Sequence, residues 1–421
     1  MILYFFYIIC SPLLYLILHI AKLFSPKISD HLAVEKKLIT DLKEKIKQIN
    51  NKKILLFHAA SAGEFEQIKP ILRQLNKNNF FIIQSFTSPT IYHKEKNNNL
   101  FDICCYHPYD FLWSSYIFFK SILPDIYIIT RHDVWPIHML VCQYLNIPCY
   151  YINANVHKKS IWSYKILKSF ASRVLSKFDM IFVPSNRIKK NIIQILESNA
   201  KITVTGDTRF DQIIDRKNRN NDHILPSFYL NNNNIIFGSY DSYDEKIILD
   251  SIRALFPNGD KDLKKNNIGI ILVPHEVDYK NINNLIIQLN KIFITPSIFK
   301  NLANMKNNNL IIIDKVGILA DLYKYANLAY VGSGFTTGVH SVIEPAIYGC
   351  TIGHGPEFEL LDEAKDMHNN NLTHVITSES DMIQFMNLIN DKDKLQKKEV
   401  LQNYMIKYYG ASDKIIQGIG L

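Results

Sequence analysis

Residues 328–356 read LAYVGSGFTTGVHSVIEPAIYGCTIGHGP, and they indicate the fold class more clearly than any other part of the chain. The apolar run Leu328–Val331 predicts a short strand, and glycines at 332, 334 and 338 predict a loop that opens onto a helix near Ser341. A second strand is expected to end in Gly353–Pro356. Glycine lets the backbone approach a ligand closely, and a helix N-terminus offers unpaired N–H groups and a partial positive charge. The stretch therefore predicts an α/β unit with a seat for a phosphate or a nucleotide.

Strands and helical runs alternate along the rest of the chain as well, which is typical of parallel sheets with crossover helices. Polar, Asn-rich sequence over Asp211–Asn234 interrupts the alternation and marks a domain boundary. We therefore expect two Rossmann-like domains flanking a cleft, over residues 25–220 and 221–421, with ligands at the carboxyl ends of the strands. Helices are predicted over Val34–Ile49, where the helix is expected to be exposed, over Glu64–Leu75, and from about Lys394. Strands are predicted over Lys53–Ala59, Phe80–Phe86, Ile103–Tyr106, Ile126–Thr130, Cys149–Asn153, Met180–Pro184, Ile202–Thr205, Ile235–Ser239, Ile268–Pro274, Phe293–Thr295, Leu310–Asp314, Leu328–Val331 and Thr351–Gly353.

The N-terminus is strongly apolar. Residues 1–21 contain no Asp, Glu, Lys or Arg, a length that can span a bilayer as a helix. Positive charge follows at Lys22 and Lys27, which favours a cytoplasmic location for the rest of the chain. Residues 1–24 are therefore predicted to be an uncleaved transmembrane anchor; a buried N-terminal helix is the alternative.

Charge and cysteine content exclude several classes of function. The net charge of +9 is compatible with nucleic acid or with an anionic membrane surface. Many lysines fall in Lys/Asn-rich runs such as Lys94–Asn99 that are typical of solvated loops, so we expect no nucleic-acid partner. The 6 cysteines are scattered without a CxxC pair, which argues against a zinc site and against a disulfide scaffold.

Two Ser-x-x-Glu motifs lie at predicted helix starts. Ser61-x-x-Glu64, in FHAASAGEFE, matches a capping box; alternatively, Glu64 is a general base, with Ser61 and Gly63 on the acceptor side. Ser341-x-x-Glu344 is a second capping-box match, and its functional interpretation has the helix start receiving a phosphate while Glu344 binds ribose hydroxyls.

Other loops that follow strands are candidates for the nucleotide site, although each can equally be an ordinary turn. They are Gly238–Glu245, Val273–Glu276 and Asp314–Ala320. The chain has no Walker A lysine motif and no HExxH motif, and its two DxD matches do not follow strands, so no metal is expected.

Taken together, these motifs resemble the Kdo transferases, which attach 3-deoxy-D-manno-octulosonic acid to the lipid A precursor. His58–Glu64 is similar to the family's H-x-x-S-x-G-E, whose glutamate is the catalytic base. Thr205–Asp211 resembles T-G-N-x-K-F-D with Arg209 in place of lysine, and His340–Pro345 resembles H-N-x-x-E-P. Ser88–Thr90, Pro108–Asp110, Trp135–Pro136 and Gly317 recur in similar order.

The resemblance implies a GT-B fold and inverting transfer of Kdo from CMP-Kdo to lipid IVA in lipopolysaccharide biosynthesis, without a metal or other cofactor. It places the enzyme at the cytoplasmic face of the inner membrane, in contact with membrane lipids. Glu64 would be the base, and Asp133 and Arg209 would support the transition state. The implied CMP-binding residues are Ser239, Pro274, His275, Val316, Gly317, Ile318, Ser341, Val342, Ile343 and Glu344.

Several positions depart from the family pattern. Asp133 stands where the family has glutamate, Ser341 where it has asparagine, Ile318 where it has glutamate, and His275 where many members have arginine. Two other functions therefore stay open: a membrane-associated GT-B transferase that uses a UDP-sugar, and a non-catalytic membrane-tethered protein that binds nucleotide or lipid.

Overall fold

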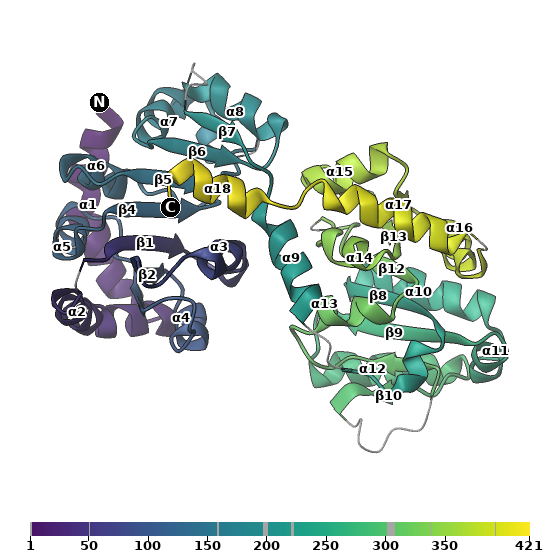
Figure 1. Cartoon of the computed structure of the whole chain (residues 1–421). Coiled ribbons are helices and arrows are strands. Elements are labelled where there is room, and N and C mark those ends of the chain that lie inside the picture. The colour runs from purple at the N-terminus through teal and green to yellow at the C-terminus, as the bar shows by residue number, and fades with distance from the viewer. Residues whose placement is uncertain are drawn as a thin grey trace. The chain divides into compact units, whose positions relative to one another are not determined.

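The computed structural model describes residues 2–49, 51–157, 160–196, 201–219, 223–300, 308–336, 338–391 and 393–421. The chain forms two compact units, each described here by itself (Figure 1). The N-terminal unit comprises Met1–Gln212 together with Tyr408–Leu421, and the C-terminal unit comprises Ile213–Lys407.

The N-terminal unit is built on a 7-stranded parallel sheet of order β3-β2-β1-β4-β5-β6-β7. Its strands are short apolar runs buried on both faces, as expected where helices cover a parallel sheet. The predicted strands of this half are confirmed to within one residue at each end. They are β1 (Lys53–Ala59), β2 (Phe80–Phe86), β3 (Ile103–Tyr106), β4 (Ile126–Thr130), β5 (Cys149–Ile152), β6 (Met180–Val183) and β7 (Ile202–Val204).

Helices cover this sheet. The predicted exposed helix is part of the longer α2, which buries Leu42 completely and packs Leu38, Ile39 and Ile46 against the core. The expectation that it is exposed was therefore wrong, because its apolar positions face β3 and α5. The helices of the unit are α1 (Ile2–Ala21), α2 (Pro26–Lys47), α3 (Ala62–Gln74), α4 (Pro89–Glu95), α5 (Leu112–Ile122), α6 (Pro136–Tyr144), α7 (Lys168–Leu175), α8 (Asn186–Leu196), the first part of α9 (Thr208–Arg219), and α18 (Ala411–Ile419).

The N-terminal helix α1 contacts α5. The ring of Tyr15 packs edge-on against Phe111 and Trp113, at centroid distances of 5.5 and 5.3 Å. In the described part of the chain, no single helix is long and apolar enough to cross a membrane. Phe5–Ala21 and Pro26–Lys47 pass this test only together, as a pair bent by 114°.

The C-terminal unit contains a second 7-stranded parallel sheet, of order β10-β11-β9-β8-β12-β13-β14. Phe293–Thr295 is not a strand; the edge strand lies slightly later, at β10 (Ser297–Ile298), and β14 (Thr373–Val375) was not predicted. Both are short edge strands with little apolar sequence of their own. The remaining strands are β8 (Asn233–Tyr240), β9 (Ile268–Pro274), β11 (Leu310–Ile312), β12 (Leu328–Val331) and β13 (Thr351–His354), and the helices are α10 (Ser242–Leu255), α11 (Asp260–Lys265), α12 (Tyr279–Lys291), α13 (Leu319–Leu322), α14 (Ile343–Tyr348), α15 (Asp362–Asn369), α16 (Glu379–Asn387) and α17 (Lys394–Ile406).

The division of the chain differs from the predicted boundary at residues 220 and 221. It falls between Gln212 and Ile213, inside helix α9, and α18 returns to the N-terminal unit. Figure 1 shows α18, in yellow, beside the strands of that unit. Ile415 is fully buried there in a core that includes strand β1, and the buried carboxylate of Asp211 accepts the N–H groups of Gly410 and Ser412 at 2.8 and 2.6 Å. These long-range contacts hold the C-terminal segment on the first unit.

Candidate functional site

A capped helix start follows the central strand β1 of the N-terminal unit. β1 ends at Ala59, and Ser61 has an extended backbone before α3 begins. The Ser61 hydroxyl accepts the N–H of Glu64 at 3.4 Å, and Oε2 of Glu64 accepts the N–H groups of Ala60 at 2.7 Å and Ser61 at 3.2 Å. The predicted capping box is therefore confirmed.

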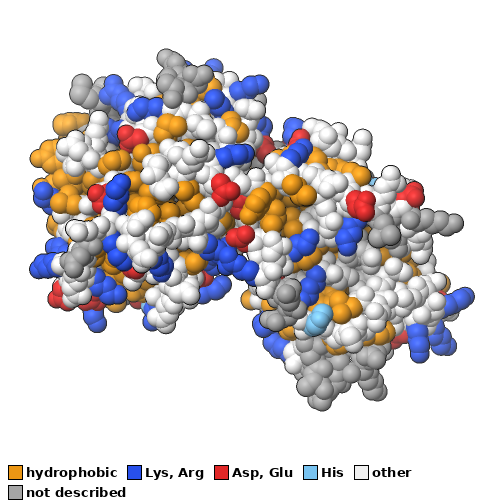
Figure 2. Space-filling model, viewed as in Figure 1, with side chains coloured by type: hydrophobic (Ala, Val, Ile, Leu, Met, Phe, Trp, Pro, Cys, Tyr) orange, Lys and Arg blue, Asp and Glu red, His pale blue; other side chains and the backbone are white. Residues whose placement is uncertain are grey.

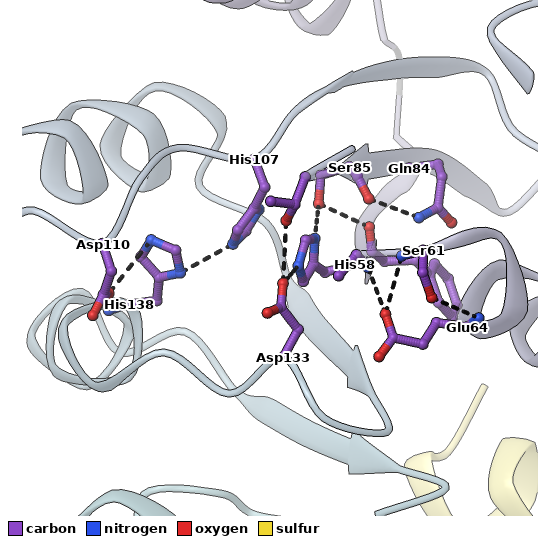
Figure 3. A network of polar contacts seen from close by, with 12 residues as sticks. His58, Ser61, Glu64, Gln84, Ser85, His107, Asp110, Asp133 and His138 are labelled. Atoms are coloured by element: carbon purple, nitrogen blue, oxygen red, sulfur yellow. Dashed lines mark hydrogen bonds and ion pairs between the residues drawn. The ribbon is translucent and has the colours of Figure 1, made fainter. Parts of the chain in front are cut away.

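The same glutamate also has the surroundings of a general base. Its side chain is almost entirely buried; burial, and after it the negative charge of Asp133, raise the pKa of Glu64 above its ordinary value. Oε2 is held by backbone N–H groups, whereas Oε1 makes no hydrogen bond to another described residue and points away from them (Figure 3). A Cβ atom on Gly63 would meet nothing within 4 Å, so the first turn of α3 borders open space. Capping and proton transfer are thus compatible, because they use different oxygens of one carboxylate.

Asp133 and His58 form a short contact beside this glutamate. Oδ2 of Asp133 lies 2.6 Å from Nε2 of the fully buried His58 and accepts the Thr87 hydroxyl at 3.1 Å (Figure 3). Burial alone would raise the pKa of Asp133, but hydrogen bonds and the charge of His58 outweigh it and lower this pKa. The shorter aspartate therefore reaches a partner inside its own unit.

Two further histidines continue inward from this pair. The rings of His58 and His107 stack at a centroid distance of 3.9 Å, and Nε2 of His107 lies 3.1 Å from Nδ1 of His138 (Figure 3). At the inner end, Asp110 accepts the N–H groups of Ile137 and His138 at the start of α6. Burial, followed by the charge of His58, lowers the pKa of His107 far below its ordinary value and that of His138 to about 3, so both rings are neutral.

Little in the sequence predicts this buried array of histidines. His107 directly follows β3, and His138 lies in the first turn of α6, with nothing in their spacing to connect them. One feature of the sequence could have indicated the array. His58 and His107 lie at the carboxyl ends of strands that were predicted correctly, where ligand-binding residues of such sheets are found.

Arg209 lies in the first turn of α9 and is held by Asp207. Its Nε and Nη2 groups contact Oδ2 of Asp207 at 2.8 and 2.7 Å. Asp207 is buried, and although burial would raise its pKa, the charge of Arg209 and hydrogen bonds from it lower this pKa. The guanidinium is thus fixed in position by a neighbouring carboxylate, while its side chain stays 23% exposed.

In the C-terminal unit, a cavity of about 270 Å³ lies beside the end of β9. Pro274 and His275 line one side of it, and Tyr240 and Asp241, at the start of α10, line another. The Ser239 hydroxyl lies 3.0 Å from Nδ1 of His275, whose ring stacks on His340 at 5.2 Å. The structure therefore brings the predicted residues Ser239, Pro274 and His275 together.

The glycine loop after β12 packs closely against other segments of its unit. A Cβ atom on Gly332 would lie 2.3 Å from the Cα of Tyr240, and one on Gly334 would lie 2.7 Å from the backbone of Gly355. These two glycines are needed because neighbouring segments of the unit pack closely. The N–H of Ser333 already donates to the buried carboxylate of Asp244, at 2.6 Å, so this N–H is used inside the protein.

The predicted capping box at Ser341 and Glu344 was wrong. Helix α14 begins only at Ile343, its N-cap is Val342, and no side chain caps it. Val342 and Ile343 are fully buried, and the helix begins at these packed apolar residues instead of at Ser341. The capping box of this unit is instead at α10, between Asp241 and Asp244.

The loop before α13 carries the predicted residues Val316, Gly317 and Ile318. Gly317 has a positive φ of 86°, which glycine adopts without strain. Arg216 forms a bidentate pair with Asp321 at 2.9 and 2.6 Å and also donates to the carbonyl of Gly317 at 3.4 Å. The loop is thus tied to the last turns of α9 by an arginine that the sequence analysis did not single out.

Comparison with known proteins supports this description. Residues 40–212 match the family model described as 3-Deoxy-D-manno-octulosonic-acid transferase (kdotransferase). The match to the Kdo transferase family model thus lies within the N-terminal unit. The chain is similar to the 3-deoxy-D-manno-octulosonic acid transferase of Haemophilus influenzae, with 26% identity over 70% of this chain and 68% of the relative. The enzyme of the same name from Aquifex aeolicus is 26% identical over 77% of this chain and 81% of its own.

Solved structures support the fold. UDP-GlcNAc 2-epimerase from Neisseria meningitidis aligns with a TM-score of 0.59 at 16% identity, covering 87% of this chain and 99% of that one. A glycosyltransferase from Rickettsia africae aligns with a TM-score of 0.57 at 13% identity, covering 87% and 98%. The chain has a two-domain, GT-B-like α/β fold. The match to the family model and the Kdo transferase relatives, and not these structures, make the protein a glycosyltransferase.

The part of the chain that matches the Kdo transferase family model contains the helix start described above. His58, Ser61 and Glu64 come from the one motif H-x-x-S-x-G-E, and the structure brings all three together at the end of β1. Among the described residues, no group of three or more His, Cys, Asp or Glu side chains is arranged to hold a metal ion.

Proposed function

We propose that this protein transfers Kdo from CMP-Kdo to the lipid A precursor lipid IVA, with inversion at the anomeric carbon and without a metal ion, in lipopolysaccharide biosynthesis. The observation that carries the proposal is the carboxylate of Glu64 in a motif typical of Kdo transferases. The match of residues 40–212 to the family model and the names of the relatives support the choice of sugar.

In the proposed mechanism, Glu64 acts on the acceptor. A sugar hydroxyl of the acceptor donates its hydrogen bond to Oε1 of Glu64, which takes the proton as the hydroxyl oxygen attacks the anomeric carbon. Burial supports this role, because a raised pKa makes the carboxylate a stronger base than a glutamate in water. The backbone N–H groups of Ala60 and Ser61 hold the other oxygen, Oε2, in place throughout.

Arg209 supplies positive charge in the proposed mechanism. As the hydroxyl attacks, the bond from the anomeric carbon to the phosphate oxygen breaks and CMP departs with an additional negative charge. A guanidinium fixed by Asp207 can stabilise that charge without having to be ordered first. Asp133, by contrast, contacts His58 and Thr87. We therefore propose that the charge of Asp133 acts on Glu64 and not on the leaving group.

The donor is assigned to the C-terminal unit. The cavity beside Pro274 and His275 has a size suited to a nucleotide moiety, and Ser239 orients the ring of His275. Because Val342 and Ile343 are buried, donor contacts at this position would come from their backbone, with Ser341 and Glu344 beside them. Val316, Gly317 and Ile318 form the third predicted contact, on the loop that Arg216 holds.

We place the protein at the cytoplasmic face of the inner membrane, held by its N-terminal segment. On α1, large apolar side chains are exposed, and α5 exposes further ones next to it. Figure 2 shows hydrophobic side chains together with lysines and arginines on the side of the unit where α5 lies. An acceptor embedded in the membrane would meet the enzyme there, and basic side chains favour anionic lipids. The exposed apolar residues include Phe5, Phe6, Ile9, Leu13, Leu16 and Ile17 on α1, and Leu112, Tyr116 and Ile117 on α5.

One assay tests the proposed donor and acceptor. Purified full-length protein is incubated with CMP-Kdo and lipid IVA, and the products are weighed by mass spectrometry, which also reports the number of Kdo residues added. We expect a mass increase by whole Kdo residues, inhibition by CMP, and no inhibition by UDP at the same concentration. Transfer from a UDP-sugar, or competition by UDP alone, would refute the donor assignment.

A further inference from the structure

The buried contact between His58 and Asp133 fixes where protons lie near Glu64. The His58 ring contacts Ser85 on one side and Asp133 on the other, both within hydrogen-bonding distance (Figure 3). His58 is completely buried, so water cannot substitute for either contact. The protonation of the ring must therefore satisfy these two neighbours.

Ser85 requires a donor from the ring. Its hydroxyl contacts the carbonyl oxygen of Phe57 at 3.1 Å, and a carbonyl oxygen can only accept. This contact uses the one proton of the hydroxyl. Nδ1 of His58, which lies 3.0 Å from the same oxygen, must then donate its own proton to it.

Asp133 requires a second donor from the ring. Its carboxylate accepts from the Thr87 hydroxyl and from the side chain of Trp135 in addition to His58, surroundings that keep it ionised. An ionised carboxylate only accepts, so the proton in the 2.6 Å contact lies on Nε2 of His58. Both ring nitrogens thus carry protons, and the ring is positively charged.

We propose that His58 is an imidazolium whose ion pair with Asp133 acts as the charge-setting partner of Glu64, with both residues serving as positioning residues for the base. This inference rests on the proposed role of Glu64 and deepens it. The two charges act on Glu64 in opposite senses: the carboxylate of Asp133 favours the protonated form of Glu64, and the His58 imidazolium favours the ionised form.

The other groups around Glu64 do not change this assignment. From its own helix start it receives the N–H groups of Ala60 and Ser61, which favour the ionised form. From β5 it faces Tyr151, whose hydroxyl is buried and donates to the carbonyl of Arg131. His107, stacked on His58, is neutral, so the array contains one positive ring beside one negative carboxylate.

The first test reads the charge of His58 directly and does not depend on activity. The full-length protein is labelled with ¹⁵N-histidine, and the protonation of the ring nitrogens is read at pH 8 from their chemical shifts. We expect one buried histidine with both nitrogens protonated, and this signal should disappear in His58→Gln. Neutral rings at every buried histidine would overturn the proposal, whatever the enzyme assay shows.

The second test reads the effect on Glu64 from the acid side of the pH profile of kcat/KM. We expect Asp133→Asn to shift the acid limb of this profile by about one pH unit to lower pH, because the negative charge that favours protonated Glu64 is lost. His58→Gln should shift the acid limb by a similar amount to higher pH, because the positive charge that favours ionised Glu64 is lost. Asp110→Asn, which changes the carboxylate at the far end of the histidine array, is the matched control and should leave the limb in place. Shifts in one direction for both variants, or none, would refute the pairing.

Folding and function are kept apart in these tests. If His58→Gln does not fold, the direction of the shift in Asp133→Asn still decides, because a merely structural change would lower kcat/KM without moving the limb. If Glu64→Gln keeps full activity, the proposed base is wrong, yet the ¹⁵N measurement still reports whether the ion pair exists.

Discussion

Glu64 caps helix α3 and is also the proposed general base, and three substitutions separate these two roles. Glu64→Gln keeps an oxygen that can accept the N–H groups of Ala60 and Ser61, which now contact Oε2 at 2.7 and 3.2 Å, but it cannot take a proton. Ser61→Ala removes the hydroxyl that accepts the N–H of Glu64 and leaves the carboxylate. Glu64→Ala removes both the cap contact and the base.

The expected magnitudes differ widely between these variants. Loss of a general base costs about 10²–10⁴-fold in rate, or roughly 3–5 kcal/mol in activation free energy. Glu64→Gln should therefore lose turnover to this extent, while its free energy of unfolding changes by about 1 kcal/mol or less because the cap contacts persist as neutral hydrogen bonds. Ser61→Ala should cost about 0.5–1 kcal/mol, the low end for an N-cap, because its contact with the Glu64 N–H is long at 3.4 Å.

The assay measures initial rates of Kdo transfer by mass spectrometry and stability by chemical denaturation of the same preparations. Binding of CMP to each variant is the control for an intact donor site. We expect Glu64→Gln to be folded, to bind CMP normally, and to be nearly inactive. Ser61→Ala should keep turnover and CMP binding and lose only a little stability. Near-normal turnover by Glu64→Gln would show that this residue is only a cap and would refute the reasoning.

Three further outcomes are expected. Because catalysis needs ionised Glu64 and burial raises its pKa, kcat/KM should fall on acidification at a pH above the ordinary range of glutamate; an unchanged rate down to pH 4 would contradict this. Asp207→Asn should lower kcat and cost about 1–3 kcal/mol of stability near neutral pH, because the guanidinium of Arg209 loses its charged partner. The stability difference from wild type should vanish on acidification, since the pKa of Asp207 is lowered and its contribution disappears as the pH falls through that pKa. Ile415→Ala should lower the free energy of unfolding of the N-terminal unit by about 2–5 kcal/mol, because Ile415 is buried in its core. Lys414→Ala, at an exposed position of the same helix, is the control and should change this free energy very little. Equal effects of the two substitutions would contradict the packing of α18 on that unit.

The regular elements were predictable because their signals are local. Strands such as β1 and β9 contain the apolar runs Ile54–Phe57 and Ile270–Val273, and their bounds lie within two residues of the ends of these runs. Short edge strands such as β10 and β14 carry no such run, and the sequence misplaced one and missed the other. Their pairing depends on a neighbouring strand and not on their own residues.

The two Ser-x-x-Glu motifs show the limit of local reasoning at the site. Ser61 and Glu64 form the capping box that the spacing predicts, because α3 begins where the sequence expects it. Ser341 and Glu344 have the same spacing but form none, because burial of Val342 and Ile343 moves the helix start beyond the serine. The Ser-x-x-Glu spacing predicts a helix cap, but the packing of neighbouring apolar side chains determines whether the cap forms.

The sequence by itself determined the α/β class, the positions of the strands that contain apolar runs, and the motif that contains His58, Ser61 and Glu64, since these depend on residues close together in the chain. Only the tertiary structure decided that Asp133 meets His58, that the rings of His107 and His138 continue inward from it, and that α18 returns to the first unit. Those contacts join residues that are far apart in the sequence, and the residues next to each of them in the chain do not indicate its partner. They form because folding brings the ends of parallel strands to one edge of a sheet and because buried polar groups must find a partner there.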